Sequence, residues 1–196
     1  MIATRTGQVQ RVTSETNVSV EIHLDGRGHA TVHTGIGFLD HLLTSFARHA
    51  RCDLTVRCEG DLHVDDHHTS EDVALTLGQA LDQALGDRRG VIRFGQALVP
   101  LDEALTRVAI DLSGRPFADV NLGLTRETLG SLATENIAHA LRTFATAARL
   151  TLHVDVLKGE NDHHRAESSF KGLAVALRQA VSPSGFVDVP STKETL

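Results

Sequence analysis

Short stretches of alternating apolar and polar residues mark the first half of the chain. Residues 18–26 (VSVEIHLDG) alternate strictly, and residues 29–35 (HATVHTG) follow after a turn that is rich in glycine. This period of two predicts strands, and the turn predicts that the two strands form a hairpin. Residues 52–61 (CDLTVRCEGD) return to the same period and predict another strand.

Two other stretches in this half have apolar residues at helical spacing. Residues 37–50 (GFLDHLLTSFARHA) place Phe38 and Phe46 on one face, and residues 69–86 keep that spacing up to Gly86. Both patterns predict amphipathic helices, and glycine is typical of a helix end. The predicted order of elements in the first half is therefore ββαβα.

The second half of the chain repeats this order. The predicted strands lie at residues 104–114, 115–123 and 151–159, and the predicted helices at residues 134–150 and 164–181. Repetition of a whole element order indicates an internal duplication. We therefore expect an α+β fold of two duplicated ββαβα half-domains, residues 1–92 and 93–196, that form one compact unit with a shared interior.

The repeat extends to polar residues that commonly bind metals. Each half offers a histidine from its middle helix, then a histidine doublet and a glutamate at the start of its last helix. These residues are His41, His67, His68 and Glu71 in the first half, and His139, His163, His164 and Glu167 in the second. The chain contains 12 histidines, which also favours a metal-binding protein.

The spacing H-H-x-x-E puts three potential ligands on one side of a helix. At about 100° per residue, the glutamate lies about 40° from the first histidine and about 60° from the second. The two imidazoles diverge by about 100°, so one ion is not expected to take both. Eight ligands suffice for two sites, each with three imidazoles and one carboxylate. Such nitrogen-rich sites suit Mn, Fe, Co, Ni or Zn better than Mg or Ca.

The sequence leaves the pairing of ligands within the two sites open. The repeat suggests one site with His41, His68, Glu71 and a histidine of the second doublet, and another with His139, His164, Glu167 and a histidine of the first. Exchanging the doublet partners satisfies the same count.

Charge and composition exclude several classes of partner. The formal net charge is −6 and no basic block is present, so nucleic acid is not expected as a partner. The N-terminal residues lack the apolar core of a signal peptide, and no apolar run has the length of a membrane span. We therefore expect a cytoplasmic protein without a membrane partner.

Several motifs resemble the imidazoleglycerol-phosphate dehydratase family over residues from about Arg11 to Lys193. They are GIGFLDHLL, DLHVDDHHTSEDVALTLGQAL, DLSGRPF, TLHV, NDHHRAESSFKGLAVALRQA and PSTK. The resemblance implies a hydro-lyase of histidine biosynthesis, which dehydrates D-erythro-imidazole glycerol phosphate to imidazole acetol phosphate. It implies two Mn²⁺ ions per active site, with other divalent transition metals as alternatives.

The resemblance also carries expectations about architecture. It implies helices packed between two four-stranded mixed sheets, as in ribosomal protein S5 domain 2-like folds. It further implies a homo-oligomer in which trimers assemble into a 24-mer, with metal sites between subunits.

Roles for individual residues follow from the resemblance and not from spacing. A phosphate pocket is implied for Arg93, Arg115, Lys171, Ser191 and Lys193. Arginine forks and lysine charges are suited to a phosphate dianion. The reaction removes a proton from a carbon without an adjacent carbonyl, so metal ions must supply the electron sink and a carboxylate must move the proton. The resemblance gives that acid–base role to Glu15.

Two other classes of function stay open at the level of sequence. A metal-binding or storage protein would explain the histidines but would have no use for the phosphate residues. A metal-dependent hydrolase would use a similar site to cleave the phosphate ester. Phosphate-dependent binding of the substrate separates a dehydratase from a storage protein. Incubation with imidazole glycerol phosphate separates it from a hydrolase, because a hydrolase releases inorganic phosphate and a dehydratase forms a ketone that retains it.

Overall fold

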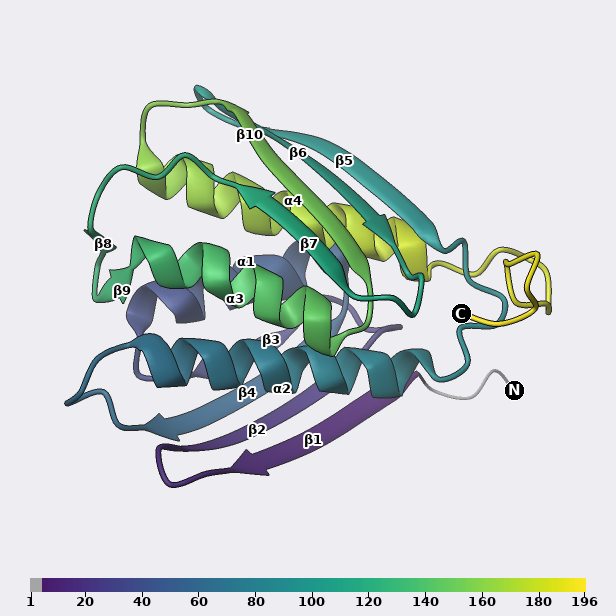
Figure 1. Ribbon diagram of the computed structural model, residues 1–196, viewed down its shortest axis with the longest axis horizontal. Helices are drawn as coiled ribbons and strands as arrows, with labels where there is room; N and C mark the ends of the chain where they lie inside the picture. The colour runs from purple at the N-terminus through teal and green to yellow at the C-terminus, as the bar shows by residue number, and fades with distance from the viewer. Residues whose placement is uncertain (1–4) are drawn as a thin grey trace.

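Two four-stranded sheets enclose a layer of helices in the computed structural model, which describes residues 5–196 (Figure 1). The first sheet contains, in spatial order, β1 (Thr6–Val12), β2 (Thr16–His23), β4 (Asp53–Gly60) and β3 (Ala30–His33). The second contains β5 (Phe94–Leu101), β6 (Ala104–Asp111), β10 (Thr151–Lys158) and β7 (Phe117–Asn121). Between the sheets lie α1 (Gly37–Ala50), α2 (His67–Leu85), α3 (Thr134–Ala147) and α4 (Asp162–Val181), and β8 (Thr128–Leu129) pairs with β9 (Leu132–Ala133) before α3.

The two sheets repeat one topology, which confirms the expected fold class. In the first sheet β1, β2 and β4 pair antiparallel, and β3 pairs in parallel with β4. In the second sheet β5, β6 and β10 pair antiparallel, and β7 pairs in parallel with β10. The chain therefore has an α+β fold of two duplicated halves, with helices between mixed sheets.

Two details of the predicted element order are different in the structure. Each half begins with a further strand, β1 or β5, in which the fully buried residue is a glycine, so the apolar alternation typical of a strand is weak. The expected hairpin between residues 18–26 and 29–35 is wrong, because β4 lies between β2 and β3. The helix α1 joins β3 to β4 as a parallel crossover, and this connection places β4 beside β2.

One contact between an edge strand and a helix occurs in both halves. A Cβ atom on Gly7 would lie 1.9 Å from the carbonyl oxygen of Ala80 in α2, and a Cβ atom on Gly95 would lie 1.9 Å from that of Ala176 in α4. Beside these contacts, the Gln83 side chain accepts from the backbone of Gln8 at 2.8 Å, and the Gln179 side chain accepts from the backbone of Gln96 at 2.9 Å. Glycine is thus required where β1 and β5 lie flush against their helices.

The helices from the two halves share one apolar core. Phe46 of α1 and Phe144 of α3 meet edge to face, with ring centroids 6.2 Å apart. Helix α1 packs against α4, and α2 packs against α3, so each helix contacts a partner from the other half. This packing between the two halves determines which polar side chains lie close together at the helix ends. The division of the chain at residue 92 stays a prediction.

None of the helices within residues 5–196 combines the length and the apolar character needed to cross a bilayer.

Candidate metal centre

The histidine doublets lie in the first turns of α2 and α4, at the same end of the molecule (Figure 1). The side chain of Asp65 accepts from the backbone N–H of His67 at 2.8 Å, and that of Asn161 accepts from His163 at 2.9 Å. The first backbone N–H groups of a helix have no acceptor within the helix, and here the side chain two residues earlier in the sequence provides one. Matching residues therefore begin both helices, and they place both doublets equivalently.

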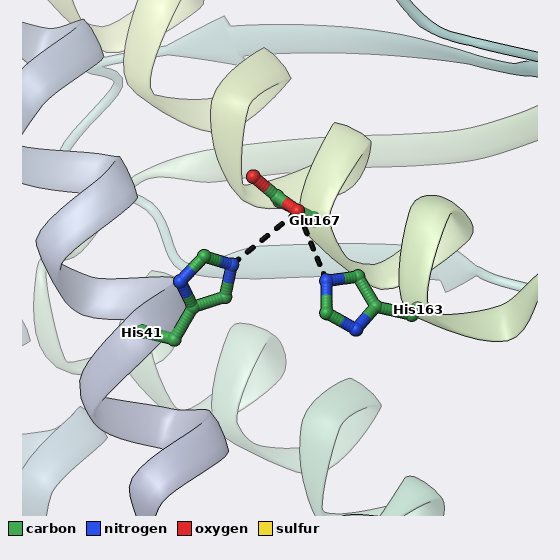
Figure 2. A group of neighbouring side chains, drawn as sticks. All are labelled: His41, His163 and Glu167. Carbon is green, nitrogen blue, oxygen red and sulfur yellow. Dashed lines mark hydrogen bonds and ion pairs between the residues drawn. The ribbon is translucent and has the colours of Figure 1, made fainter.

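One cluster consists of His41, His163 and Glu167, and is called here the His41 cluster. Figure 2 shows the rings of His41 from α1 and His163 from α4 on either side of the Glu167 carboxylate. The Oε2 atom of Glu167 lies 3.3 Å from His41 Nε2 and 3.2 Å from His163 Nε2. Phe38 packs against both rings, with centroids 5.9 and 4.9 Å away, and limits their movement.

The second cluster consists of His67, Glu71 and His139, and is called here the His139 cluster. His139 Nε2 lies 2.9 Å from Glu71 Oε1, and His67 Nε2 lies 3.9 Å from Glu71 Oε2. The two rings stack with centroids 5.0 Å apart. His67 Nδ1 lies 2.9 Å from Oδ1 of the buried Asn136, which holds the ring so that Nε2 faces the glutamate.

The donor atoms in both clusters fit a transition-metal ion. Ligand atoms about 2.1 Å from a shared ion are separated from one another by about 3 to 3.5 Å, depending on the coordination geometry. The Nε2 and carboxylate oxygen atoms here are 2.9 to 3.9 Å apart, and each set lies within 4.8 Å overall. Two imidazoles and one carboxylate are also the ligand types that Mn, Fe, Co, Ni and Zn accept.

The structure pairs ligands across the two halves. His41 was expected beside Glu71 and lies beside Glu167, while His139 was expected beside Glu167 and lies beside Glu71. The reason is the helix packing, because α1 contacts α4 and α3 contacts α2. Each cluster therefore contains one histidine from the first half of the chain and one from the second.

The second histidine of each doublet points away from these clusters. The divergence of the two imidazoles was expected, but His68 was expected beside Glu71 and His164 beside Glu167, and those places are taken by His67 and His163. The rings of His67 and His68 are 6.0 Å apart, and those of His163 and His164 are 6.1 Å apart. His68 Nδ1 lies 3.0 Å from Asp61 Oδ2, and the hydrogen bond raises the pKa of His68.

His164 has an equivalent partner. Its Nδ1 lies 2.7 Å from Glu103 Oε2, and that hydrogen bond raises the pKa of His164. Asp61, Glu103 and Asn136 were not identified from the sequence. Of these three residues, only Glu103 could have been found from the sequence, because it occupies the same place in its hairpin as Glu15 does in the first half.

Lys171 lies at the His41 cluster, whereas the other four residues predicted to bind phosphate line a separate groove of the protomer. Its Nζ is 2.9 Å from Glu167 Oε1, so one carboxylate oxygen faces the lysine and the other faces the histidines. Burial acts to raise the pKa of Glu167, but hydrogen bonds from Lys171 and His41 outweigh it and lower the pKa to about 2. Glu167 is therefore ionised and can serve as a ligand at neutral pH.

Glu15 lies at the tip of the β1–β2 hairpin, next to the first doublet. Its Oε1 atom is 3.7 Å from His68 Nε2, and the side chain is half exposed. The hairpin is fixed to α2, because the buried carboxylate of Asp72 accepts from Arg11 at 2.9 Å and from the hydroxyl of Thr16. The acid–base role of Glu15 stays a prediction.

The other four predicted phosphate residues come together in one groove. Arg93, Arg115, Ser191 and Lys193 line it, together with Asp188. Arg115 and Lys193 form no salt bridge with residues in the part of the chain that the structure describes, so their charges are available to an anion.

Arg93 is already engaged within this groove. Its guanidinium donates to both oxygens of Asp111, at 2.7 and 3.1 Å, and to the carbonyl of Pro190 at 2.7 Å. Two of its five donors remain for a ligand. Arg93 therefore anchors the C-terminal segment in addition to any role in binding phosphate.

The groove and the clusters lie at opposite ends of the protomer. The backbone N–H of Arg93 donates to the carbonyl of Ala180, near the end of α4, whereas His163 lies in the first turn of that helix. The helical rise of 1.5 Å per residue separates His163 from Ala180 by about 26 Å. Figure 1 shows α4 running from the doublet end to the yellow C-terminal segment.

Comparisons with known proteins agree with one another. The family model described as imidazoleglycerol-phosphate dehydratase matches residues 34–177. A curated imidazoleglycerol-phosphate dehydratase of Phytophthora nicotianae is 57% identical over 192 residues, which are 98% of this chain and 42% of that protein. One of Candida glabrata is 53% identical over 96% of this chain and 98% of its own length.

Solved structures give the same result. A crystal structure of imidazoleglycerol-phosphate dehydratase from Staphylococcus aureus has a TM-score of 0.82 and 35% identity, and the match covers 91% of this chain and 99% of that one. The enzyme from Pyrococcus furiosus, in complex with (S)-C348, has a TM-score of 0.83 and 37% identity, with 96% and 100% covered.

Proposed function

Because the chain belongs to the imidazoleglycerol-phosphate dehydratase family of hydro-lyases, we propose that it dehydrates D-erythro-imidazole glycerol phosphate to imidazole acetol phosphate in histidine biosynthesis. The observation that carries this proposal is the presence of two three-ligand clusters, built from matching helices of a duplicated fold. Each cluster consists of two histidines and one glutamate, which are ligand types that suit a divalent transition metal.

Each cluster would hold one Mn²⁺ ion, with other divalent transition metals as alternatives. His41, His163 and Glu167 would bind one ion, and His67, Glu71 and His139 the other. When bound, the ions supply the Lewis acidity that withdraws electrons from the imidazole ring. His68 and His164 would each complete the site of a second copy, since they point away from the clusters of their own protomer.

The distance between the groove and the clusters supports active sites that are shared between protomers. About five single bonds join the imidazole ring of the substrate to its phosphorus atom, so the substrate reaches at most about 8 Å. A span of about 26 Å along α4 is too long for one protomer to bind both ends of this molecule. We therefore propose a homo-oligomer in which the groove of one copy faces the clusters of another. Its size, trimers that assemble into a 24-mer, is what the resemblance to the family implies.

In the proposed active site, Arg115, Lys193 and Ser191 bind the phosphate, with Arg93 holding the segment that carries Ser191 and Lys193. Lys171 acts on Glu167, and it adds positive charge near the His41 cluster, where it is also available to the substrate. Glu15 moves the proton, because its exposed carboxylate lies beside the doublet and forms no ion pair with a lysine or arginine of the described residues.

Incubation of the Mn²⁺-loaded protein with imidazole glycerol phosphate tests the proposal. We expect a ketone product that retains its phosphate, and no release of inorganic phosphate. His41→Ala should abolish turnover, whereas His153→Ala, at an exposed histidine of β10 outside both clusters, should not. Release of phosphate by the unsubstituted protein would instead identify a hydrolase. A cytoplasmic location is part of the proposal and is tested by cell fractionation.

A further inference from the structure

The tips of the two edge hairpins correspond to each other in the duplication. Val9 pairs with Val20 in the first hairpin, and Ala97 pairs with Val108 in the second, so each residue of the first hairpin matches the residue 88 positions later. The same shift relates Gly7 to Gly95, which make equivalent contacts with α2 and α4. Glu15 is therefore the internal counterpart of Glu103.

These two glutamates interact differently with their neighbouring doublets. Glu103 is fully engaged, because Oε2 accepts from His164 Nδ1 at 2.7 Å while Oε1 accepts from the backbone N–H groups of Asn161 and Glu160 at 2.8 and 3.2 Å. The Glu15 carboxylate has no hydrogen bond to any residue within the described range 5–196, and lies 3.7 Å from His68 Nε2.

Asp61 accounts for this difference. It accepts from His68 Nδ1 at 3.0 Å, so in the first half it occupies the place that Glu103 takes in the second. Past the bulge between Val156 and Lys158, the register of β4 and β10 makes Glu160 the counterpart of Asp61, and the exposed Glu160 side chain accepts no hydrogen bond from a described residue. The backbone N–H of Asp61 also donates to the carbonyl of Glu15 at 3.1 Å, which ties the two residues together.

Partial burial of the Asp61 carboxylate has an energetic cost, which points to a specific role for it. Its side chain is 18% exposed, and its Oδ1 atom is buried without a hydrogen-bond partner among the described residues. An unpaired buried carboxylate oxygen is destabilising. The hydrogen bond that Oδ2 accepts from His68 Nδ1 is therefore the contact that assigns a role to this carboxylate.

We propose that Asp61 and Glu103 are positioning residues that keep a proton on Nδ1 of His68 and His164, and that Asp61 thereby leaves Glu15 free for proton transfer. A carboxylate can only accept, so the neutral ring carries its proton on Nδ1 and its lone pair on Nε2. Nε2 is then the metal-binding atom that each histidine presents to a second copy. This inference rests on the proposed metal-dependent dehydratase function.

The inference also explains why the two hairpin glutamates differ, although the second half has an exposed carboxylate nearby, Asp102, whose Oδ2 lies 3.8 Å from His164 Nε2. Both hairpin tips carry a glutamate beside a doublet, but the glutamate of the second half is occupied as a histidine partner.

The test uses Asp61→Ala and Glu103→Ala in the full chain, with Glu59→Ala and Glu160→Ala as matched controls at exposed glutamates nearby. Binding of Mn²⁺ to the stripped proteins is measured by titration calorimetry. We expect both test variants to bind Mn²⁺ about 10- to 100-fold more weakly than the controls, the usual effect of losing a partner of a metal ligand. Test variants that bind as tightly as the controls would overturn the positioning role.

Turnover at saturating Mn²⁺ then separates the two positioning residues. Glu103→Ala should recover most of its turnover, whereas Asp61→Ala should stay about 100-fold lower, because Glu15 can then move onto Nδ1 of His68. Equal recovery of both would refute the claim that Asp61 keeps Glu15 free.

If Asp61→Ala does not fold, Asp61→Leu gives a second variant of nearly the same shape. Leucine has no acceptor for the proton on Nδ1, so the same loss of Mn²⁺ affinity is expected. Unchanged affinity would contradict the inference. Wild-type protein that binds Mn²⁺ without dehydrating the substrate would refute the proposed function, while the affinities of the variants would still decide the positioning role.

Discussion

Replacement of Lys171 by methionine tests whether this lysine stabilises the ionised form of Glu167, as the structure indicates, in addition to any contact with phosphate. The Nζ atom lies 2.9 Å from Glu167 Oε1, and the lysine and glutamate side chains are 19% and 14% exposed. Methionine keeps most of the apolar length of lysine but removes the charge. The variant therefore isolates the electrostatic contribution of the pair in the metal-free protein.

The magnitude follows from the pKa of Glu167, which is lowered from 4.5 to about 2. At 1.36 kcal/mol per pKa unit this shift corresponds to about 3 kcal/mol as an upper bound for all groups that act on the carboxylate. His41 supplies part of the shift, and water screens the pair at the open cluster. We therefore expect Lys171→Met to lower the free energy of unfolding by about 1 kcal/mol at pH 7.

The pH dependence has a defined sign. Glu167 has a lowered pKa in the folded state, so its stabilisation is complete above pH 4.5 and is lost as the pH falls toward 2. Urea unfolding of chelator-treated protein should show a difference between wild type and Lys171→Met that disappears in this window. Lys158→Met, the same change at an exposed lysine of β10, should have little effect at either pH. A difference for Lys171→Met that is equal at pH 7 and pH 2 would refute the electrostatic reasoning.

Three further predictions follow from the geometry. Gly7→Ala and Gly95→Ala should each destabilise the fold by about 3 kcal/mol or more, because the new Cβ atom would lie 1.9 Å from a helix carbonyl oxygen. The control Gly37→Ala, where a Cβ atom would have no atom within 4 Å, should be neutral or stabilising by up to about 1 kcal/mol. Thermal unfolding that fails to distinguish the two variants from the control would contradict this packing. Glu15→Gln should keep the fold and both metal ions, measured by circular dichroism and metal analysis, yet lose about 100-fold or more in turnover, whereas unchanged turnover would remove Glu15 from the mechanism. Chelation should reduce the particle mass in light scattering while the subunits stay largely folded, because ligands from different copies share ions, and an unchanged mass would argue against shared sites.

The sequence predicted the helices and the duplication well because both depend on local patterns. The helix predicted at residues 37–50 is found as α1, Gly37–Ala50, since its apolar spacing and its burial agree. The edge strands β1 and β5 were missed because a glycine takes the buried position where a strand usually has a large apolar residue. Such a strand is specified by the helix packed against it, and this contact is not visible in a local pattern.

The pairing of the candidate ligands could not be predicted, because it depends on how the two halves pack. His41 and Glu71 belong to the same half, but α1 lies against α4, so His41 meets Glu167. Lys171 is a similar case. Its place one turn after Glu167 was visible in the sequence, but that the lysine contacts this glutamate depends on side-chain directions at the His41 cluster.

Anomalous scattering at the manganese edge, from crystals of the Mn²⁺-loaded protein, tests the central claim most directly. We expect two peaks per protomer, one at His41, His163 and Glu167 and one at His67, Glu71 and His139, each completed by His68 or His164 of a second copy. Peaks away from these residues, or no bound manganese, would contradict the proposed metal centre.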